Sequence, residues 1–320
     1  MRLLSSMATA LLLDPAFEKH HTGPGHPECP ERIATLRESL AKAGLVDRCL
    51  RLTARPATAV EILRVHTEGY FKTATAEIGP ATGIGYLSTG DTIYGPGSLD
   101  VALEAAGGVL TAVDAVIGGR ARNAFCAVRP PGHHATADRG MGFCIFNNVA
   151  LAARHAREGH GIDRVAIIDW DVHHGNGTQD IFYEDGSVFY FSTHQHPWYP
   201  GTGRRDETGT GKGRGTTLNA PLPAGSGMEE IGPAFEAFER RMEAWRPELI
   251  LISAGFDSRI GDPLGHFRLT DDDFIALTRR LLRIAESSAG GRLISVLEGG
   301  YSLPGLATAA GAHLRTLLEV

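Results

Sequence analysis

Histidine, aspartate and tyrosine side chains follow four short apolar runs of this sequence, and side chains of these types can bind a metal ion and move protons. The runs 125–128, 165–168, 249–252 and 293–297 are followed, in that order, by RPPGHH, DWDVHH, SAGFD and EGGY. Carboxylates, imidazoles and a phenol are the groups that a metal-dependent hydrolase uses. The sequence therefore points to metal-assisted hydrolysis, provided that the fold brings the four segments together.

The spacing of two of these residues predicts a metal site. Asp171 and His173 are two positions apart, so in an extended segment both side chains point to the same face, and Asp257 supplies a third ligand from another strand end. Three nitrogen and oxygen ligands leave a fourth position open for water, as in a catalytic zinc site. The oxygen-rich set also admits Fe²⁺ or Co²⁺.

Each piece alone also has an ordinary structural explanation. A histidine pair such as His133-His134 is more often a hydrogen-bonded polar pair, an isolated D-x-D is usually a solvated loop, and Tyr301 after two glycines could be a turn aromatic. Because these residues occur together at successive strand ends, the functional explanation is favoured.

The elements that must position these residues are readable from the apolar pattern. Continuous apolar runs, rather than alternating ones, are typical of strands buried on both faces of a parallel sheet. We expect such strands at 10–13, 125–128, 165–168, 188–191, 249–252 and 293–297. Helical patterns lie between them at 31–43, 98–116 with Ser98 as N-cap, 148–157, 228–245, and 274–286 after a capping box of Thr270 and Asp273. The alternation predicts an α/β fold with a mostly parallel central sheet flanked by helices, and ligands beyond the carboxyl ends of its strands.

Length and composition are those of one globular domain. The chain has 320 residues, 42% of them hydrophobic, and we expect a single catalytic domain at 9–320 after an N-terminal extension at 1–8. The apolar stretch 3–13 is interpreted as leading into a first strand rather than as a signal peptide, because no small-residue cleavage site follows. The glycine-rich stretch 201–215 is expected to be a loop on the side of the active site.

Charge, apolar runs and cysteine content argue against several classes of protein. The net charge of −6 comes without a lysine or arginine cluster, so we expect no nucleic-acid partner. No apolar run reaches the ~18 residues of a membrane span, so no membrane partner is expected. The four cysteines are scattered without a C-x-x-C pair, which argues against disulfides and zinc knuckles and favours a reducing, cytoplasmic location.

The segments R-P-P-G-H-H, G-F-C-I-F-N-N, D-W-D-V-H-H-G-N-G-T-Q, S-A-G-F-D and E-G-G-Y resemble the histone deacetylase and acetylpolyamine amidohydrolase superfamily. The similarity runs from about residue 11 to about residue 314. It is greatest with class II histone deacetylases and with bacterial histone deacetylase-like amidohydrolases. The resemblance implies an arginase-like α/β fold and a zinc-dependent hydrolase of linear amides.

The resemblance also implies roles for individual residues. The implied zinc ligands are Asp171, His173 and Asp257. The implied catalytic groups are the tandem histidines His133 and His134, beside the attacking water, and the Tyr301 hydroxyl, which binds the carbonyl oxygen. Asp169 matches the carboxylate behind His133, whereas Asn176 stands where class I enzymes have a second aspartate behind His134. An amide supplies no charge to stabilise an imidazolium, so the sequence leaves open which histidine is the base and which the acid.

A substrate tunnel and cation sites are implied in the same way. The implied tunnel residues are the walls Phe143 and Tyr199, a tyrosine where phenylalanine is usual, with Gly142, Asp91 at the rim, Leu264 at the gatekeeper position and Arg32 at the foot. The implied structural potassium ligands are Asp169, Ser192 and the backbone carbonyls of Asp171, His173 and Thr193. A second cation would lie near Phe182, Asp185 and Val188.

The substrate implied is an acyl-lysine peptide or another small acyl amide. Polyamine-specialised relatives have an acidic gatekeeper or a long inserted loop, whereas Leu264 is neutral and residues 70–100 show no such insertion. An acetylpolyamine deacetylase is the alternative. A ureohydrolase with two manganese ions would need further carboxylates after His173, where His-Gly-Asn-Gly stands. A non-catalytic acyl-ligand-binding protein would need no oxyanion donor such as Tyr301.

Overall fold

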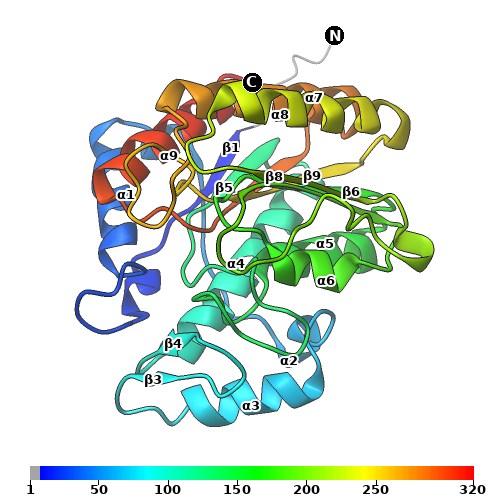
Figure 1. The fold of residues 1–320 in the computed structure, drawn as a ribbon. Coiled ribbons are helices and arrows are strands. Elements are labelled where there is room, and N and C mark those ends of the chain that lie inside the picture. The colour runs from blue at the N-terminus through cyan, green and yellow to red at the C-terminus, as the bar shows by residue number, and fades with distance from the viewer. Residues whose placement is uncertain (1–7) are drawn as a thin grey trace.

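A computed structural model describes residues 8–320 of the chain. Residues 1–7 of the predicted extension 1–8 lie outside the described residues. The centre of the structure is an eight-stranded sheet in the order β2-β1-β5-β10-β9-β6-β7-β8, in which every pairing is parallel (Figure 1). The strands are β1 Thr9–Leu12, β2 Leu50–Leu52, β5 Asn123–Cys126, β6 Val165–Asp169, β7 Val188–Gln195, β8 Thr217–Leu222, β9 Leu249–Ala254 and β10 Leu293–Leu297. This confirms the predicted fold class.

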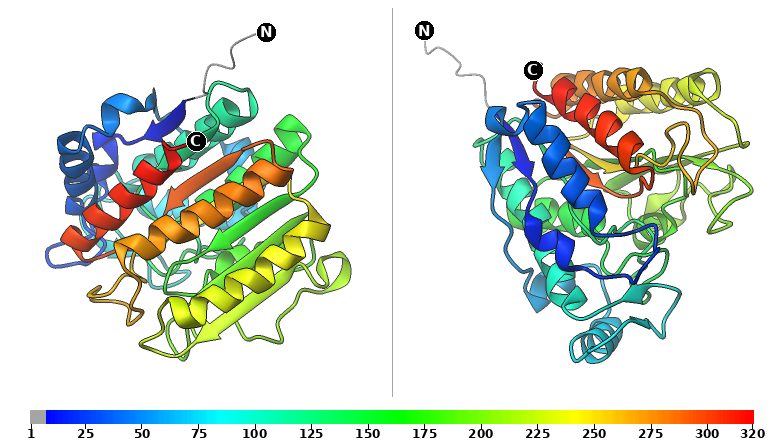
Figure 2. Two further views of the ribbon diagram at one scale, coloured as in Figure 1. Left: turned by 90° about the horizontal axis from the view of Figure 1, so that it is seen from above. Right: turned by 90° about the vertical axis from the view of Figure 1, so that its left-hand side faces the viewer.

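Helices cover both faces of the sheet. The helices α7 Met228–Trp245, α8 Asp271–Ser288 and α9 Leu303–Leu317 lie side by side across one face (Figure 2), and α1 Glu31–Lys42 packs against α9. On the other face lie α4 Ser98–Ile117, α5 Asn148–His160 and α6 Asn176–Phe182 (Figure 1). Beyond these are α2 Ala59–Ile62, α3 Glu68–Ile78 and a small antiparallel hairpin of β3 Gly85–Tyr86 and β4 Ile93–Tyr94.

The continuous apolar runs form the middle of the sheet, as predicted. Every residue of β6, β9 and β10 is buried, because helices cover these strands on both sides. The two edge strands β2 and β8 were not predicted. Their sequences, LRL and TLNAPL, mix polar with apolar residues, because an edge strand needs less apolar surface than a central one.

Of the two helix N-caps predicted from the sequence, one is present in the structure and the other is not. At Thr270 the predicted capping box is present: the Asp273 backbone N–H donates to Thr270 Oγ1 (3.3 Å), and the Thr270 N–H donates to Asp273 Oδ2 (2.7 Å). The N-cap prediction for Ser98 is wrong. Ser98 is the first helical residue, Gly97 precedes it with φ 77°, and the Ser98 hydroxyl accepts the Gly95 N–H instead.

Sheet order determines what the strand ends can build. Strands β5, β10, β9 and β6 are direct neighbours, so the four polar segments that follow them all start from adjacent points on the carboxyl edge. The glycine-rich stretch 201–215 lies beside α6 and β8, where Glu207 accepts from the Gln179 amide and the Arg204 carbonyl accepts from Asn219. Thr202 lies 2.7 Å from His174, which follows the predicted ligand His173, so the start of the stretch is on the predicted side of the sheet, although none of its residues lines the pocket described below.

Candidate active site

Asp171, His173 and Asp257 converge at the carboxyl edge. Their ligand atoms lie within 4.8 Å of one another, and all three residues are buried. His173 Nδ1 is 2.9 Å from Asp171 Oδ1 and 3.1 Å from Asp257 Oδ2. The expected convergence is present, but the extended segment that was to produce it is not. Strand β6 ends at Asp169 and the chain bends through 171–173, so that the His173 N–H donates to Asp171 Oδ1 (2.9 Å).

The surroundings of these carboxylates fit a bound cation. A Cβ on Gly255 would lie 2.1 Å from Asp171 Oδ2, and one on Gly299 would lie 1.9 Å from Asp257 Oδ2, so only glycine leaves room at either position. The Gly299 N–H donates to Asp171 Oδ2 (2.8 Å), and the Val172 N–H donates to Asp257 Oδ1 (2.9 Å). One imidazole nitrogen and two fixed carboxylates form a donor set that suits zinc or another divalent first-row ion.

A proton on His173 offsets part of the negative charge of the two carboxylates when no ion lies between them. Burial, together with the charge of Asp171, raises the pKa of Asp257 to about 7. Burial alone would lower the pKa of His173, but the two carboxylates outweigh it and raise that pKa to about 10. A cation at this point would take over the role of that proton, because metal ligands must be deprotonated.

The tandem histidines differ in their hydrogen bonds and in their charge. His133 Nδ1 is 2.9 Å from Asp169 Oδ2, whereas His134 Nδ1 is 2.9 Å from the amide oxygen of Asn176. Burial disfavours a charge on both rings. At His133 the carboxylates of Asp169, Asp171 and Glu298 outweigh burial and hold the pKa well above its usual value. At His134 burial and the neighbouring His133 and His173 hold the pKa well below it.

A buried glutamate that sequence reasoning did not single out positions this pair. Glu298 Oε2 accepts the Gly132 N–H (2.6 Å) and the His133 N–H (3.1 Å), and Oε1 accepts the Ser253 hydroxyl (3.2 Å). It links the end of β10 to the loop after β5. The E-G-G-Y segment contained the residue, but only the topology shows that it faces the histidine loop.

Tyr301 is positioned by its backbone and by the guanidinium beneath its ring. Asp262 Oδ2 accepts the N–H groups of Tyr301 (2.7 Å) and Ser302 (3.0 Å). The Arg32 guanidinium carbon lies 5.0 Å from the centre of the Tyr301 ring. Burial raises the pKa of Tyr301 well above its usual value, so the phenol stays protonated and can donate a hydrogen bond.

A pocket of about 270 Å³ opens above these groups. Phe143 and Tyr199 form walls as predicted, and Phe143 has a φ of 69°, an uncommon backbone conformation for a non-glycine residue that recurs at functional sites. Five of the six predicted tunnel residues line this pocket, and Arg32 does not. Trp198 is added to them, and its indole N–H donates to the Leu264 carbonyl (2.9 Å). The lining residues are Asp91, His134, Gly142, Phe143, His173, Trp198, Tyr199, Leu264 and Tyr301.

The hydroxyl that distinguishes Tyr199 from phenylalanine has a partner at the rim. It donates to Asp91 Oδ2 (3.1 Å), and Asp91 Oδ1 accepts the Gly142 N–H (2.8 Å). The Tyr199 ring lies edge-on to His134 with ring centres 5.1 Å apart. Tyr199 therefore connects the exposed rim carboxylate to the histidine at the base of the pocket.

The predicted potassium residues come from β6, from β7 and from the bend after β6. Asp169 on β6 and Ser192 on β7 are paired in register, and both are buried, as is Thr193. At the predicted second cation position, the Asp185 carboxylate is bound by Arg154 (2.5 Å) and by the Ser187 hydroxyl (2.5 Å). The Asp185 side chain is thus already paired with a cationic side chain.

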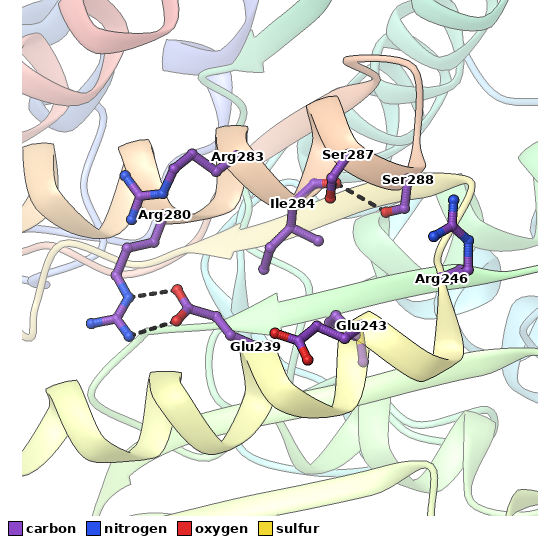
Figure 3. Close-up of a pocket in the computed structure, with 9 residues that line it drawn as sticks. Glu239, Glu243, Arg246, Arg280, Arg283, Ile284, Ser287 and Ser288 are labelled. Atoms are coloured by element: carbon purple, nitrogen blue, oxygen red, sulfur yellow. Dashed lines mark hydrogen bonds and ion pairs between the residues drawn. The ribbon is translucent and has the colours of Figure 1, made fainter.

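A larger hollow, of about 520 Å³, lies between α7 and α8 and is a different kind of surface (Figure 3). It contains none of the predicted site residues, and its most prominent feature is an ion pair of Arg280 with Glu239 (2.6 Å). Because the convergent ligands and histidines are at the sheet edge, the smaller pocket is the candidate active site.

The known proteins that this chain resembles have related names and activities. The model of the histone deacetylase domain matches residues 26–317. A probable deacetylase of Archaeoglobus fulgidus is 41% identical over 302 residues, covering 93% of this chain and 83% of that protein. The histone deacetylase-like amidohydrolase of Pseudomonas aeruginosa is 42% identical over 280 residues (87% and 73%). The human polyamine deacetylase HDAC10 is 41% identical over 311 residues (91% and 45%).

The fold agrees with the same family. The crystal structure of the HDA15 HD domain superposes with a TM-score of 0.93 at 37% identity, covering 98% of this chain and 90% of that one. The relatives named above are deacetylases and amidohydrolases, which are hydrolases acting on amide bonds. This chain therefore belongs to the histone deacetylase family.

Proposed function

We propose that this protein hydrolyses small N-acyl amides with one divalent metal ion, zinc in the first instance, held by Asp171, His173 and Asp257. The observation that carries the proposal is the meeting of these three ligands with His134 and Tyr301 at one pocket. A divalent ion bound there would polarise the amide carbonyl and acidify a water molecule. The same donor set accepts Fe²⁺ or Co²⁺.

The two histidines divide the proton transfers. Because the His134 Nδ1 proton is directed at the Asn176 oxygen, its Nε2 carries a lone pair that accepts a proton from the attacking water. His133 is held as an imidazolium by Asp169 and donates a proton to the leaving amine, or stabilises the developing charge. The unequal partners, a carboxylate and an amide, support this assignment.

The Tyr301 hydroxyl donates to the amide carbonyl oxygen as it becomes an oxyanion. Its pKa is raised by burial, so the proton stays on the phenol, and a preformed donor of this kind is worth several kcal/mol in the transition state. Asp262 and Arg32 act on the position of the ring rather than on the reacting atoms.

The substrate class is an acyl-lysine side chain or a similar slender acyl amide. Phe143 and Tyr199 would flank an alkyl chain, which gains from burial between aromatic walls. Leu264 at the mouth supplies no negative charge for a polyamine. The exposed Asp91 carboxylate, beside the likeness to a polyamine deacetylase, keeps acetylpolyamines as the second candidate.

The proposal also includes a structural potassium ion and a cellular compartment for the protein. A structural potassium ion would be held by Asp169, Ser192 and the backbone carbonyls of Asp171, His173 and Thr193. Its positive charge would offset the buried carboxylate of Asp169. The cysteines at 29, 49, 126 and 144 are free thiols, which supports a reducing compartment such as the cytoplasm.

The other two candidate functions have less support. A two-metal ureohydrolase needs bridging carboxylates after His173, but His174 there is 2.7 Å from the Thr202 hydroxyl and 3.0 Å from the Gln179 amide oxygen. A non-catalytic acyl-binding protein would not need two histidines with opposed pKa shifts.

None of the helices in residues 8–320 is long and apolar enough to cross a membrane.

The proposal is tested with metal-quantified protein on a panel of acetyl-lysine, longer acyl-lysine and trifluoroacetyl-lysine peptides together with acetylated polyamines. We expect the highest kcat/KM on the lysine substrates and no activity in Asp257→Ala. Higher kcat/KM on acetylspermidine than on every lysine peptide would move the assignment to polyamines. If Asp257→Ala were as active as the parent, the proposed metal site would be wrong.

A further inference from the structure

A second group of metal-binding side chains lies at the opposite edge of the sheet. Asp114 is in the last turn of α4, which leads into the start of β5, and His160 is the last residue of α5, which leads into the start of β6. The helices α4 and α5 pack against each other. Because the strands are parallel, this group lies at the amino edge, with the length of the strands between it and the candidate active site.

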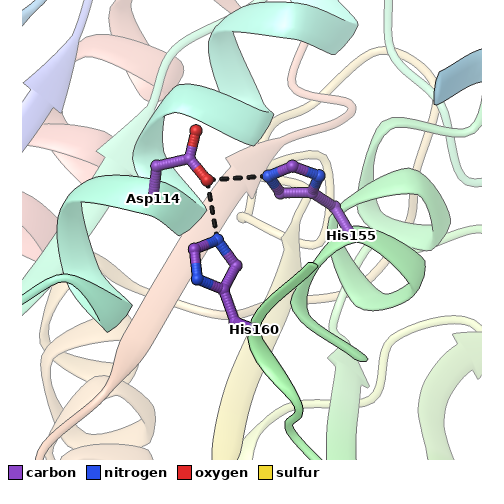
Figure 4. A group of neighbouring side chains, drawn as sticks. All are labelled: Asp114, His155 and His160. Carbon is purple, nitrogen blue, oxygen red and sulfur yellow. Dashed lines mark hydrogen bonds and ion pairs between the residues drawn. The ribbon is translucent and has the colours of Figure 1, made fainter. Parts of the chain in front are cut away.

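The three side chains converge on one point. The Nε2 atoms of His155 and His160 are each 2.7 Å from the same Asp114 oxygen, Oδ1, which they approach from two sides (Figure 4). The ligand atoms of the three residues lie within 4.8 Å of one another. Two protons thus point at one carboxylate oxygen.

The ligand atoms lie close to the positions that they would occupy around a bound ion. Zinc lies about 2.0–2.2 Å from nitrogen and oxygen ligands, which places tetrahedral ligand atoms ~3.4 Å apart. The two imidazoles would need to withdraw from the carboxylate by less than ~1 Å. The side chains of Asp114 and His160 are 40% and 26% exposed, so both have freedom to make this adjustment.

The remaining nitrogen of each ring decides how readily it can bind an ion. A neutral imidazole that binds metal through Nε2 carries its proton on Nδ1, where a hydrogen-bond acceptor favours binding. His155 Nδ1 instead lies 2.9 Å from Arg64 Nη1, which can only donate. Arg64 therefore competes with an ion. Its other partner, Glu158 at 3.2 Å, offers the guanidinium a place away from His155.

We propose that Asp114, His155 and His160 form a second, weaker site for a divalent first-row transition ion, and that the ion links the end of α4 to the end of α5. Two imidazoles and one carboxylate favour Zn²⁺, Co²⁺ or Ni²⁺ over the hard ions Mg²⁺ and Ca²⁺. On binding, each neutral ring moves its single proton from Nε2 to Nδ1 through solvent, and the Asp114 carboxylate offsets part of the ion's charge. The site leaves positions open to water.

The test counts zinc ions per chain by equilibrium dialysis against a fixed concentration of free Zn²⁺ that saturates the weaker site of the wild-type protein. The wild-type protein is expected to hold two ions, and the His155→Ala/His160→Ala variant one, with its hydrolytic activity unchanged. The Asp257→Ala variant is expected to hold one ion without activity, so the two sites are counted independently. His21→Ala, which removes an exposed histidine elsewhere, is the matched control and should hold two.

Substitutions at Arg64 test the geometry without removing a ligand. Arg64→Gln places an amide oxygen where the guanidinium was, so it should tighten zinc binding at the second site by roughly tenfold in the Asp257→Ala background. Arg64→Lys keeps a donor there and should leave the affinity as in the parent.

The outcomes separate this site from the proposed function. Two ions in the wild type with one in the double-histidine variant support the second site, whatever the activity. An equal zinc count and affinity in the wild type and the double-histidine variant would overturn it. An unchanged affinity in Arg64→Gln would overturn the binding of zinc through His155 Nε2.

Discussion

The two edges of the sheet use the same kinds of side chain in contrasting settings. At the carboxyl edge Asp171, His173 and Asp257 are buried, and glycines beside them leave space that no Cβ could share. At the amino edge Asp114 and His160 are partly exposed and lie at helix ends.

The difference lies in what fixes the ligands. Backbone N–H groups of Val172 and Gly299 hold the carboxylates of the carboxyl edge, and Glu298 and Asp262 hold the backbone of the residues beside them. Among residues 8–320, the carboxylate of the amino edge is held by the two histidines alone. Similar ligands can thus serve a reaction in one place, and no more than a link between helices in the other.

The largest effect is expected from a substitution of a ligand at the carboxyl edge. Asp257→Ala removes one of three ligands and should lower kcat/KM on an acetyl-lysine peptide by at least ~10³-fold, because the ion supplies several kcal/mol of charge stabilisation. Steady-state hydrolysis with metal analysis measures this. Asp114→Ala is the matched change at the amino edge, and its kcat/KM should equal that of the parent. Equal losses in both variants would contradict the division of roles.

His134→Gln tests the proton acceptor at the carboxyl edge. It should lower kcat by about 10²–10⁴-fold, the usual contribution of a general base, while metal content stays at the level of the parent. His155→Gln makes the same change at the amino edge and should leave kcat unaltered. A His134→Gln variant with the kcat of the parent would remove His134 from the mechanism.

Tyr301→Phe removes only a hydroxyl. We expect kcat to fall on the order of 10²–10³-fold with little change in KM, because the hydroxyl acts on the oxyanion and not on the bound amide. Tyr94→Phe, which removes a hydroxyl from the small hairpin, serves as the control. Near-full turnover in Tyr301→Phe would show that another group binds the oxyanion.

Helix α5 connects the two edges, and its start depends on a buried neutral histidine. His66 Nε2 accepts the N–H of Asn147, the N-cap of α5, and burial lowers the pKa of His66 to about 4. Since this folded-state pKa is below the unfolded value of about 6.5, the unfolded chain takes up the proton first as pH falls. The stability that His66 contributes is complete above pH 6.5 and is lost towards pH 4, by about 3 kcal/mol in all.

Urea unfolding between pH 7 and pH 4.5 measures this effect. His66→Gln, which keeps an acceptor and a donor but does not titrate, should lose less of its unfolding free energy over this range than the parent. Parallel curves for the two proteins would contradict the account of His66.

More of the carboxyl edge than of the amino edge could be predicted from the sequence, for physical reasons. Ligands such as Asp171 and Asp257 follow buried apolar runs directly, and parallel pairing brings such strand ends together. The bend at 171–173 could not be foreseen from a two-residue spacing. His155 and His160 are five residues apart, a spacing that does not share a helix face, and Asp114 meets them only through helix packing.

Residues that act through the backbone were also beyond sequence reasoning. Glu298 and Asp262 were visible within motifs, but their targets, the N–H groups of His133 and Tyr301, come from distant segments. Trp198 had no signal of its own and enters the pocket because its indole bonds to Leu264.

The most direct test of the central claim is a zinc titration of metal-free protein, monitored by hydrolysis of an acetyl-lysine peptide. It is best performed in the His155→Ala/His160→Ala variant, so that only the carboxyl edge is filled. We predict that chelation abolishes hydrolysis and that activity returns linearly and reaches its plateau at one equivalent of zinc. Hydrolysis that survives chelation, or a plateau that needs two equivalents, would contradict a single-ion site at Asp171, His173 and Asp257.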